Sequence, residues 1–323
     1  MNNKIIITGG LGFIGSNLIR YLLNKNLKIL NLDKISYCSV NSTRKIKNSN
    51  YQFKKIDLSV IKTSRLTNVI KNYRPSFIIN LAANSHVDNS IKNPFDFANT
   101  NFSATLNLLV SIKNSGLLNK TKLIHIGTDE IYGEIKKKEK KFFSETSALH
   151  PSSPYSASKA ACHHLVTSFS KTYNLKYKII NPSNNFGPFQ FPEKLIPKTI
   201  HRISKNQKVI IYKNGQNIRQ WMFVQDTCIA IYKIMKLKKK NEIYNLGYGK
   251  LIKNIDLVRM IYFEIKKLAK IKKLKLKYTK DRKGHDFKYC SSNIKTSNAI
   301  RLSASNFKES IKKTILWYLN EAK

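Results

Sequence analysis

Near its beginning the chain reads Ile5-Ile6-Ile7-Thr8-Gly9-Gly10-Leu11-Gly12-Phe13-Ile14-Gly15-Ser16. This run is an apolar strand, a glycine-rich turn and the start of a helix whose apolar face carries Leu18, Ile19, Leu22 and Leu23. A second predicted strand, over residues 28–32, ends in Asp33. A strand, a glycine-rich turn, a helix, a strand and an acid within about 30 residues are typical of a dinucleotide-binding unit.

The residues of this unit also indicate which dinucleotide is bound. Gly9, Gly12 and Gly15 let the backbone approach a pyrophosphate, and the free N–H groups at the helix N-terminus would bind it. Asp33 would accept hydrogen bonds from the adenosine ribose hydroxyls. Because a carboxylate at this place repels a 2′-phosphate, we expect NAD rather than NADP, a preference that Lys34 weakens slightly.

Strands and helices continue to alternate as far as residue 181. We expect further strands over 51–56, 77–81, 123–127 and 177–181, and helices over 60–73, 96–114 and 155–173. This alternation predicts an α/β fold with a doubly wound, parallel Rossmann-type sheet. Asp57 follows the third strand and could reach an adenine. Ala82 and Ala83 follow the fourth and leave room for a cofactor against the backbone.

After Pro182 the pattern loosens, and the second half of the chain predicts a smaller α/β domain. We expect helices over 223–236, 256–270 and 308–318 and a strand over 274–278. The predicted NAD-binding Rossmann domain comprises residues 1–187 and about 223–252. The predicted substrate-binding domain comprises about 188–222 and 253–323, and the binding site would lie in the cleft between the two.

Length and composition favour a cytoplasmic globular protein. The chain has 323 residues, 41% of them hydrophobic, which is enough for a sizeable core. We expect no signal peptide, because Met1 is followed almost directly by the first strand, and no apolar run is long enough to span a membrane. The four cysteines are widely spaced and predict neither a disulfide framework nor zinc. We therefore expect reduced thiols and no metal.

The formal net charge of +41 leaves two interpretations open. One is a polyanion-binding scaffold built on a former enzyme. The other is compositional drift towards the Lys, Asn and Ile codons of an AT-rich genome. Of the 59 basic residues nine are Arg and 50 are Lys. Because Arg is the preferred residue for bidentate phosphate and base contacts, this composition favours drift, and we expect no specific nucleic-acid partner.

Two short runs combine groups suited to acid–base chemistry. Thr128, Asp129 and Glu130 follow a predicted buried strand, at the sheet edge where open α/β sheets bind ligands. Tyr155 and Lys159 lie four residues apart on a predicted helix and therefore share a face. A cation beside a phenol lowers the pKa of the phenol, which a base that works near neutral pH requires.

Taken together, these and several other runs resemble the extended short-chain dehydrogenase/reductase family over nearly the whole chain. Within that family the resemblance is to the dTDP-glucose 4,6-dehydratases. Residues 8–16, 32–34, 85–88, 128–133, 151–160, 183–188, 191–197, 281–282 and 284–286 carry it. The Thr-Asp-Glu run discriminates most, because related epimerases and decarboxylases have other residues at positions 129 or 130.

The resemblance implies a reaction in three steps. Tyr155, helped by Lys159, would remove the proton of the sugar's C4 hydroxyl while the C4 hydride passes to NAD. Glu130 would then take the C5 proton, Asp129 would protonate the departing C6 hydroxyl, and the hydride would return to C6. Thr128 would donate a hydrogen bond to the C4 oxygen. Two neighbouring carboxyl groups with pKa values pushed apart can act as acid and base in this way.

The resemblance also implies which residues bind each ligand. Besides the glycines and Asp33, the cofactor would contact Phe13, Ile14, Lys34, Ser36, Asp57, Leu58, Leu81, Ala82, Ala83, Thr100, Tyr155, Lys159 and Asn185. The nucleotide sugar would contact Ser85, Thr128, Asn184, Lys194, Leu195, Tyr212, Arg219, Asn254, Arg282 and His285. The two arginines suit its diphosphate, because a guanidinium is a fixed fork of donors.

Several positions depart from the usual pattern of the family. Gly127, Asn84, Gln220 and Lys283 stand where a serine, a glutamate, an aspartate and a proline are usual, and none of these changes removes a catalytic group. Family members pair through helices that match 96–114 and 155–173, so we expect a homodimer. The sequence leaves open another nucleotide-sugar reaction of the same superfamily, such as a 4-epimerisation, and the thymine base rests on the resemblance alone.

Overall fold

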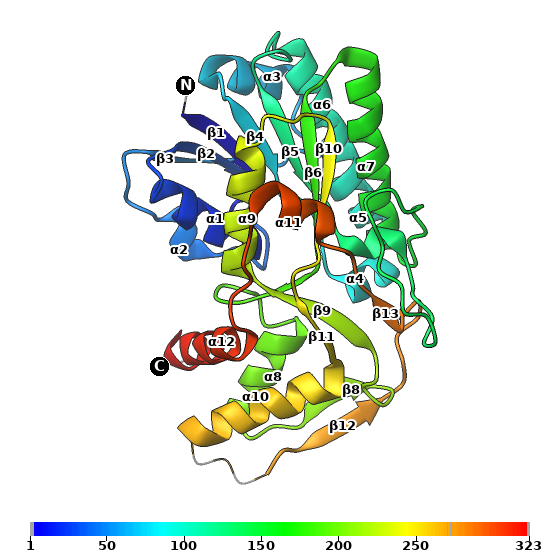
Figure 1. Cartoon of the computed structure of the whole chain (residues 1–323). Helices are drawn as coiled ribbons and strands as arrows, with labels where there is room; N and C mark the ends of the chain where they lie inside the picture. Colours follow the sequence, from blue (N-terminus) through cyan, green and yellow to red (C-terminus); the bar gives the residue numbers. More distant parts are fainter. Residues whose placement is uncertain (1–2, 270, 272, 322–323) are drawn as a thin grey trace.

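The computed structural model describes residues 3–269, 271 and 273–321, and a large parallel sheet dominates its first half (Figure 1). Seven strands of the described chain form this sheet, in the order β10 (Glu242–Leu246), β6 (Tyr177–Pro182), β5 (Lys122–Ile126), β4 (Phe77–Asn80), β1 (Lys4–Thr8), β2 (Lys28–Asp33) and β3 (Tyr51–Lys55). Every neighbouring pair is parallel. The predicted doubly wound Rossmann-type sheet is therefore confirmed.

Helices cover both faces of this sheet (Figure 1). One face packs against α1 (Phe13–Leu23), α9 (Val224–Lys236) and α11 (Ile294–Ile300), and the other against α3 (Thr63–Tyr73), α6 (Ala104–Asn114) and α7 (Pro154–Tyr173). Successive side chains of a strand point to opposite faces. Ile5 and Ile7 accordingly join the first core and Ile6 joins the second, and all three are buried. Burial on both faces explains the continuous apolar run of β1.

The order of the strands reverses between β1 and β4, which is where a doubly wound sheet forms its binding crevice. The turn after β1 lies against the segment after β4 at this point. Gly9 has a φ of +68°, and a Cβ atom there would lie 2.6 Å from the Cα atom of Ala82. Only glycine combines this backbone conformation with so close an approach.

The helix predicted over 96–114 is present but is not a regular α-helix. It begins earlier, as α5 (Pro94–Phe97), and continues through a π-helical segment, η1 (Ala98–Ser103), into α6. Such segments occur frequently at functional sites. Asn101 of η1 accepts a hydrogen bond from the Asn84 backbone N–H at 2.7 Å and donates one to the Asn84 carbonyl at 3.1 Å. The π segment is thereby tied to the crevice after β4.

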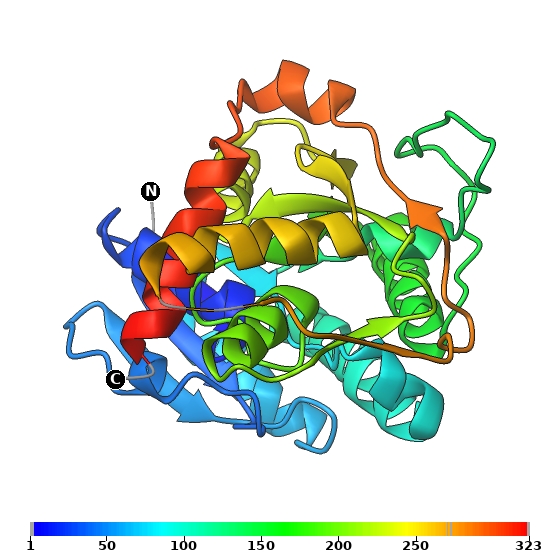
Figure 2. The same ribbon diagram turned by 90° about the horizontal axis from the view of Figure 1, so that it is seen from below.

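The second half of the chain adds two small sheets and three helices beneath the large sheet (Figure 2). Strand β9 (Ile218–Phe223) pairs with β7 (Asn184–Phe186), β11 (Lys250–Lys253) and β13 (Lys288–Tyr289), and β8 (Val209–Tyr212) pairs with β12 (Leu276–Thr279). Helices α8 (Leu195–Ser204), α10 (Asn254–Leu268) and α12 (Phe307–Glu321) pack on one another and on these sheets. Their apolar faces enclose a separate core that includes Ile200, Ile211 and Ile261.

Several boundaries differ from the predicted ones for local reasons. The helix expected from residue 60 begins at Thr63, because the Asp57 carboxylate accepts hydrogen bonds from the Ser59 N–H and hydroxyl and stabilises a turn there. The strand expected over 274–278 lies at 276–279, and α10 begins at Asn254. The predicted end of α10, Lys270, lies outside the described residues.

The short elements were not predicted individually: α2 (Asn41–Arg44), α4 (Val87–Lys92), α8, α11, β7 to β11 and β13. The division into two domains stays a prediction. Within it, β7 pairs with the second sheet although we assigned residues 184–186 to the first domain. None of the helices in the described part of the chain is long and apolar enough to cross a membrane.

Candidate active site

The Thr-Asp-Glu run lies at the carboxyl end of β5, where the chain forms a short 3₁₀ helix, η2 (Asp129–Tyr132). Thr128 is the N-cap of this helix, and its hydroxyl oxygen accepts a hydrogen bond from the Glu130 N–H at 3.3 Å. A capping side chain satisfies a backbone donor that the first turn leaves unpaired. The cap therefore fixes both carboxylates at the edge of the sheet, with Asp129 only 2% exposed.

Helix α7 places Tyr155 near these carboxylates and Lys159 against the end of β5. The helix begins with a capping box, in which Ser153 and Ser156 exchange hydrogen bonds, and with Pro154 in its first turn. Both functional side chains are buried. The Lys159 ammonium donates to the Ile126 carbonyl at 2.7 Å, which links α7 directly to the last residue of β5.

The two adjacent carboxyl groups have different environments. Burial, and then the charge of Glu130, raises the pKa of Asp129 well above its usual value. Burial also raises the pKa of Glu130, but Arg219, Arg282 and Lys194 act in the opposite direction. The Asp129 Oδ2 atom has no hydrogen-bond partner among the described residues. The arrangement suits a protonated Asp129 that can donate beside an ionised Glu130 that can accept.

The expected effect of Lys159 on Tyr155 is wrong for this structure. Burial, followed by the charge of Glu130, raises the pKa of the Tyr155 phenol, and a hydrogen bond with Thr128 acts against the rise. Burial lowers the pKa of Lys159 itself. The Lys159 ammonium is engaged by a backbone carbonyl, so it is not directed at the phenol alone. The spacing of Tyr155 and Lys159 was visible in the sequence, but the burial that shifts their pKa values was not.

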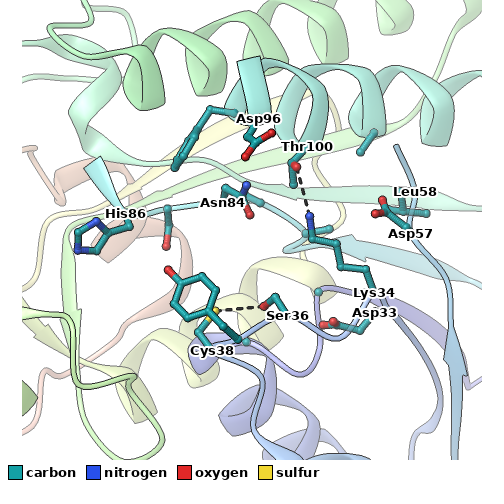
Figure 3. A pocket seen from close by; sticks show the side chains of 18 of the residues that line it. Asp33, Lys34, Ser36, Cys38, Asp57, Leu58, Asn84, His86, Asp96 and Thr100 are labelled. Carbon is teal, nitrogen blue, oxygen red and sulfur yellow. Dashed lines mark hydrogen bonds between the residues drawn. The ribbon is translucent and has the colours of Figure 1, made fainter. Parts of the chain in front are cut away.

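A cavity of about 360 Å³ lies at the crevice after β1 and β4 (Figure 3). Its walls include the predicted cofactor residues Gly9, Gly12, Asp33, Lys34, Ser36, Asp57, Leu58, Leu81, Ala82, Ala83 and Thr100, and the predicted substrate residue Ser85. Lys34 reaches across the cavity and donates to the Thr100 hydroxyl at 3.3 Å. The cavity thus joins the glycine turn to the π-helical segment.

Asp33 holds the glycine turn in place. One carboxylate oxygen accepts a hydrogen bond from the Leu11 N–H and the other accepts one from the Ile35 N–H, both at 2.9 Å. Burial raises the pKa of Asp33, and these two N–H groups oppose the rise. A carboxylate held in this way is pre-organised to accept ribose hydroxyls as well, because each oxygen has two lone pairs.

The remaining predicted cofactor residues are not part of the cavity wall. Phe13 and Ile14 open α1 and pack partly against the first core. A Cβ atom on Gly15 would lie 2.5 Å from the Gly9 carbonyl oxygen. Asn185 accepts from the Thr227 hydroxyl at 2.6 Å and donates to the Ser183 carbonyl at 2.9 Å.

Several predicted substrate residues contact the first half of the chain. The Lys194 ammonium donates to the Ser85 carbonyl at 2.7 Å. Arg282 and Tyr212 both contact the carboxylate of Asp88, at 3.4 and 3.0 Å. His285 is paired with Asp281 at 2.6 Å, and burial lowers the pKa of His285 to about 4. This imidazole is therefore neutral near pH 7.

Arg219, a predicted diphosphate-binding residue, is almost fully buried. It is 4% exposed, and its guanidinium donates to the carbonyls of Ile218, Phe287 and Asp286 at 2.8 to 3.2 Å. Its positive charge also opposes the rise in the pKa of the Asp129 and Glu130 carboxyl groups. Near it, Asn184 and Asn254 each have a buried side-chain oxygen without a partner among the described residues, and Leu195 opens α8.

Sequence reasoning missed several residues that the fold brings to this region. Tyr289 is buried beside Arg219. The cavity is also lined by Tyr37, His86 and Glu193, and the Tyr37 hydroxyl donates a hydrogen bond to Glu193 at 2.8 Å. The run 85–88 already drew attention to His86 and Asp88. No signal in the sequence distinguished Tyr289, because its strand has only two residues.

One of the departures from the family pattern fits its surroundings well. Gln220 is 2% exposed, donates to the Gly247 carbonyl at 2.7 Å and accepts from the Ser291 N–H at 3.1 Å. A neutral amide can make both bonds, whereas a carboxylate could make only the second. Gly127 lies against Asn181, whose Oδ1 atom would be 2.1 Å from an added Cβ atom. The usual serine would require this asparagine to move.

Comparison with known proteins identifies the family. The GDP-mannose 4,6 dehydratase family model matches residues 6–314. A dTDP-glucose 4,6-dehydratase of Haemophilus influenzae is 38% identical over 98% of this chain and 98% of its own. Among solved structures, DesIV, the dTDP-glucose 4,6-dehydratase of Streptomyces venezuelae with NAD bound, matches with a TM-score of 0.90 at 28% identity, over 98% of this chain and 97% of its own.

A UDP-glucose 4-epimerase of Thermotoga maritima also matches, with a TM-score of 0.88 at 25% identity, over 99% of this chain and 100% of its own. The fold alone therefore does not separate dehydratases from epimerases. In sequence, this chain is more similar to the Haemophilus influenzae dehydratase, at 38% identity, than to this epimerase, at 25%. This chain belongs to the family described by the GDP-mannose 4,6 dehydratase model, within the extended short-chain dehydrogenase/reductases.

Proposed function

We propose that this protein is a dTDP-glucose 4,6-dehydratase, which converts dTDP-glucose to dTDP-4-dehydro-6-deoxyglucose and water. The observation that carries the proposal is the pair of adjacent carboxyl groups, Asp129 and Glu130, in environments that separate their pKa values beside the buried Tyr155. Removal of water from C5 and C6 needs a base that takes the proton of C5 and an acid that protonates the hydroxyl group leaving C6. The Haemophilus influenzae relative is named for this reaction.

The crevice fits NAD on its geometry. The close approach of Gly9 to Ala82, the cavity of about 360 Å³ and the Asp33 carboxylate at its end match the needs of a pyrophosphate and a ribose. When bound there, NAD supplies the hydride acceptor for C4 of the sugar and the hydride donor for C6. Gly12, at the N-cap of α1, and the first turn of that helix would hold the pyrophosphate.

The side chains divide the proton transfers among themselves. Tyr155 takes the proton of the C4 hydroxyl, Thr128 orients the C4 oxygen, and Lys159 holds the end of β5 against α7. Once C4 is a ketone, its neighbouring C5 proton becomes acidic, and Glu130 takes it. Asp129 gives its proton to the departing C6 hydroxyl. Asp129 thereby acts in the protonation state that its environment favours, whereas Tyr155 accepts a proton only against the effect of its burial.

The nucleotide end of the substrate lies on the cationic side of the site. Lys194 and Arg282 raise the local positive charge near Glu130, and the unpartnered oxygens of Asn184 and Asn254 can accept donors from a ligand. A diphosphate carries the complementary charge. The choice of thymidine over uridine or guanosine follows from the named relatives.

A 4-epimerase is the alternative enzyme. An epimerase changes the configuration at C4 and has no need for an acid and a base at C5 and C6, so Asp129 and Glu130 favour dehydration. A different class, the polyanion-binding scaffold, predicts nucleic-acid binding that falls steeply with salt and prefers certain sequences or structures. Weak binding without preference would reflect only the 50 lysines.

We further infer a cytoplasmic homodimer. Helices α6 and α7 lie side by side on one face of the large sheet, where family resemblance puts the dimer contact. Phe95, which is 80% exposed, and Tyr173, which is 38% exposed, would supply apolar surface there. Sedimentation equilibrium should give twice the chain mass. A monomer at micromolar concentration would contradict the inference.

The experiment that tests the function is an incubation of purified protein with catalytic NAD and one nucleotide sugar at a time. Mass spectrometry follows the loss of one water and the retention of the nucleotide. We expect product from dTDP-glucose and little from UDP-glucose or GDP-mannose. A C4 epimer with its C6 hydroxyl retained would replace the dehydratase by the epimerase, and a preference for another nucleotide would correct the substrate alone.

A further inference from the structure

Tyr289 is buried next to the proposed acid–base pair, and neither the sequence motifs nor the proposed reaction uses it. It lies on β13, a strand of only two residues, and is directly opposite Arg219 in the register with β9. Both side chains are 4% exposed. The central carbon of the Arg219 guanidinium lies 4.2 Å from the centre of the Tyr289 ring. This distance is within the range of a cation–π contact, and both partners are desolvated.

Three backbone carbonyls hold the terminal nitrogens of the Arg219 guanidinium. One terminal nitrogen donates to the carbonyls of Ile218 and Phe287 at 2.8 and 3.2 Å, and the other donates to that of Asp286 at 2.9 Å. Carbonyls fix the plane from its edge and the ring supports its face. An arginine held in both ways has lost most of its side-chain freedom. Its charge therefore occupies one defined place.

That place lies within electrostatic reach of the catalytic carboxyl groups. Arg219 opposes the rise in pKa that burial imposes on both Asp129 and Glu130, and for Glu130 it has the largest opposing effect. Burial raises the pKa of Tyr289, and the two carboxyl groups raise it further. The phenol is thus neutral over the working range of pH. The ring can support the cation without adding a charge of its own.

We propose that Tyr289 is a positioning residue for the elimination step, whose ring holds the guanidinium of Arg219 beside Asp129 and Glu130. The role rests on the proposed dehydratase function. Without the ring, one side of the guanidinium loses its support, and the cation can move away from the carboxyl groups. Because a more distant cation stabilises carboxylate less, the pKa of Glu130 then rises further. The base would become available only at higher pH.

The test compares Tyr289→Leu, which removes the ring, with Tyr289→Phe, which keeps it. For Tyr289→Leu we expect the acid limb of the pH–rate profile for water loss to move up by about one pH unit. Product formation on that limb should fall about tenfold. The rate of C4 oxidation, measured as NADH absorbance in a single turnover, should change less than the rate of water loss. Tyr289→Phe should restore the acid limb to within about 0.3 pH units of the wild type.

Tyr244→Leu is the matched control. Tyr244 is a buried tyrosine, 2% exposed, whose ring also lies under a cation, 5.2 Å from the Lys295 nitrogen, but on β10 and far in sequence from β13. Loss of this ring should lower thermal stability and leave the acid limb unchanged. An equal shift in Tyr244→Leu and Tyr289→Leu would show a general effect of destabilisation and would overturn the proposal.

A second variant and a spectroscopic titration test the same role if Tyr289→Leu does not fold or the wild type makes no product. If Tyr289→Leu does not fold, Arg219→Lys, which keeps the charge but loses the flat face, should shift the acid limb in the same direction. An unshifted limb in this variant refutes the positioning role. Infrared difference spectra of the buried carboxyl groups, assigned with Glu130→Gln, report the same titration without turnover. If the wild type makes no product, the proposed function fails, but this titration still decides whether Tyr289 positions Arg219.

Discussion

The two walls of the candidate site are built in different ways. The wall after β1 and β4 includes the small residues Gly9, Gly12, Ala82 and Ala83, and its Asp33 carboxylate is fixed by two backbone N–H groups. The opposite wall consists of long charged side chains, among them Lys194 and Arg282, which contact acceptors on the first half of the chain. A rigid wall suits a cofactor that ends each cycle unchanged. A wall of side chains suits a substrate that must enter and leave.

The largest expected effect is that of removing the Tyr155 hydroxyl. Tyr155→Phe should reduce hydride transfer about 1,000-fold, because it removes the only proton acceptor proposed for the C4 hydroxyl. Stopped-flow NADH absorbance would measure this, and thermal unfolding should stay within about 2 °C of the wild type. Tyr262→Phe, another buried tyrosine, is the control. Hydride transfer at wild-type rate in Tyr155→Phe would remove Tyr155 from the mechanism.

The rigid wall should not tolerate a single added methyl group. Gly9→Ala places a Cβ atom 2.6 Å from Ala82 backbone atoms at a φ of +68°. We expect a loss of about 3 kcal/mol in the free energy of unfolding and at least about tenfold weaker NAD binding. Gly116→Ala has nearly the same φ, +71°, but open space around it. It should cost only about 1 kcal/mol and leave NAD affinity unchanged. Equal losses of unfolding free energy in the two variants, measured by denaturant titration, would show that the loss comes from backbone strain and not from the close approach to Ala82.

These contrasts also explain what the sequence could and could not predict. Gly9, Asp33 and Ala82 were recognisable because each follows a strand whose apolar pattern is local. Tyr155 and Lys159 were recognisable because helical spacing is local too. Tyr289 meets Arg219 only through the pairing of a two-residue strand with β9, and such a strand has no period to detect. Arg282 and Lys194, which oppose the rise in the pKa of Glu130, likewise come from distant elements.

A buried histidine makes the stability of the rigid half depend on pH. Burial lowers the pKa of His163, on α7, to about 4. The unfolded chain binds a proton near the ordinary value of about 6.5, so stability is lost as the pH falls from about 6.5 to 4, by roughly 3 kcal/mol. His163→Gln should remove most of this loss in urea titrations at pH 7 and 4.5. His164→Gln, on the exposed neighbour, should not. Identical pH dependence in all three proteins would contradict this assignment.

In the charged wall we expect a smaller effect, on the KM for the nucleotide sugar. Arg282→Lys keeps the charge but loses the fork of donors, so we expect KM for the nucleotide sugar to rise about tenfold with little change in kcat or NAD affinity. Arg259→Lys, at an exposed pair with Asp256, is the control. A fall in NAD affinity in Arg282→Lys would mean that the two walls are not functionally separate. An unchanged KM would remove Arg282 from the proposed diphosphate site.

The division of labour between Asp129 and Glu130 is the central claim, and one experiment tests it most directly. Asp129→Asn and Glu130→Gln are each mixed with dTDP-glucose and stoichiometric NAD, and NADH absorbance and water loss are followed in a single turnover. We predict that NADH forms in both variants and persists, while loss of water slows at least about 100-fold. Water loss at the wild-type rate in either variant, or failure of both to form NADH with NAD bound, would contradict the account.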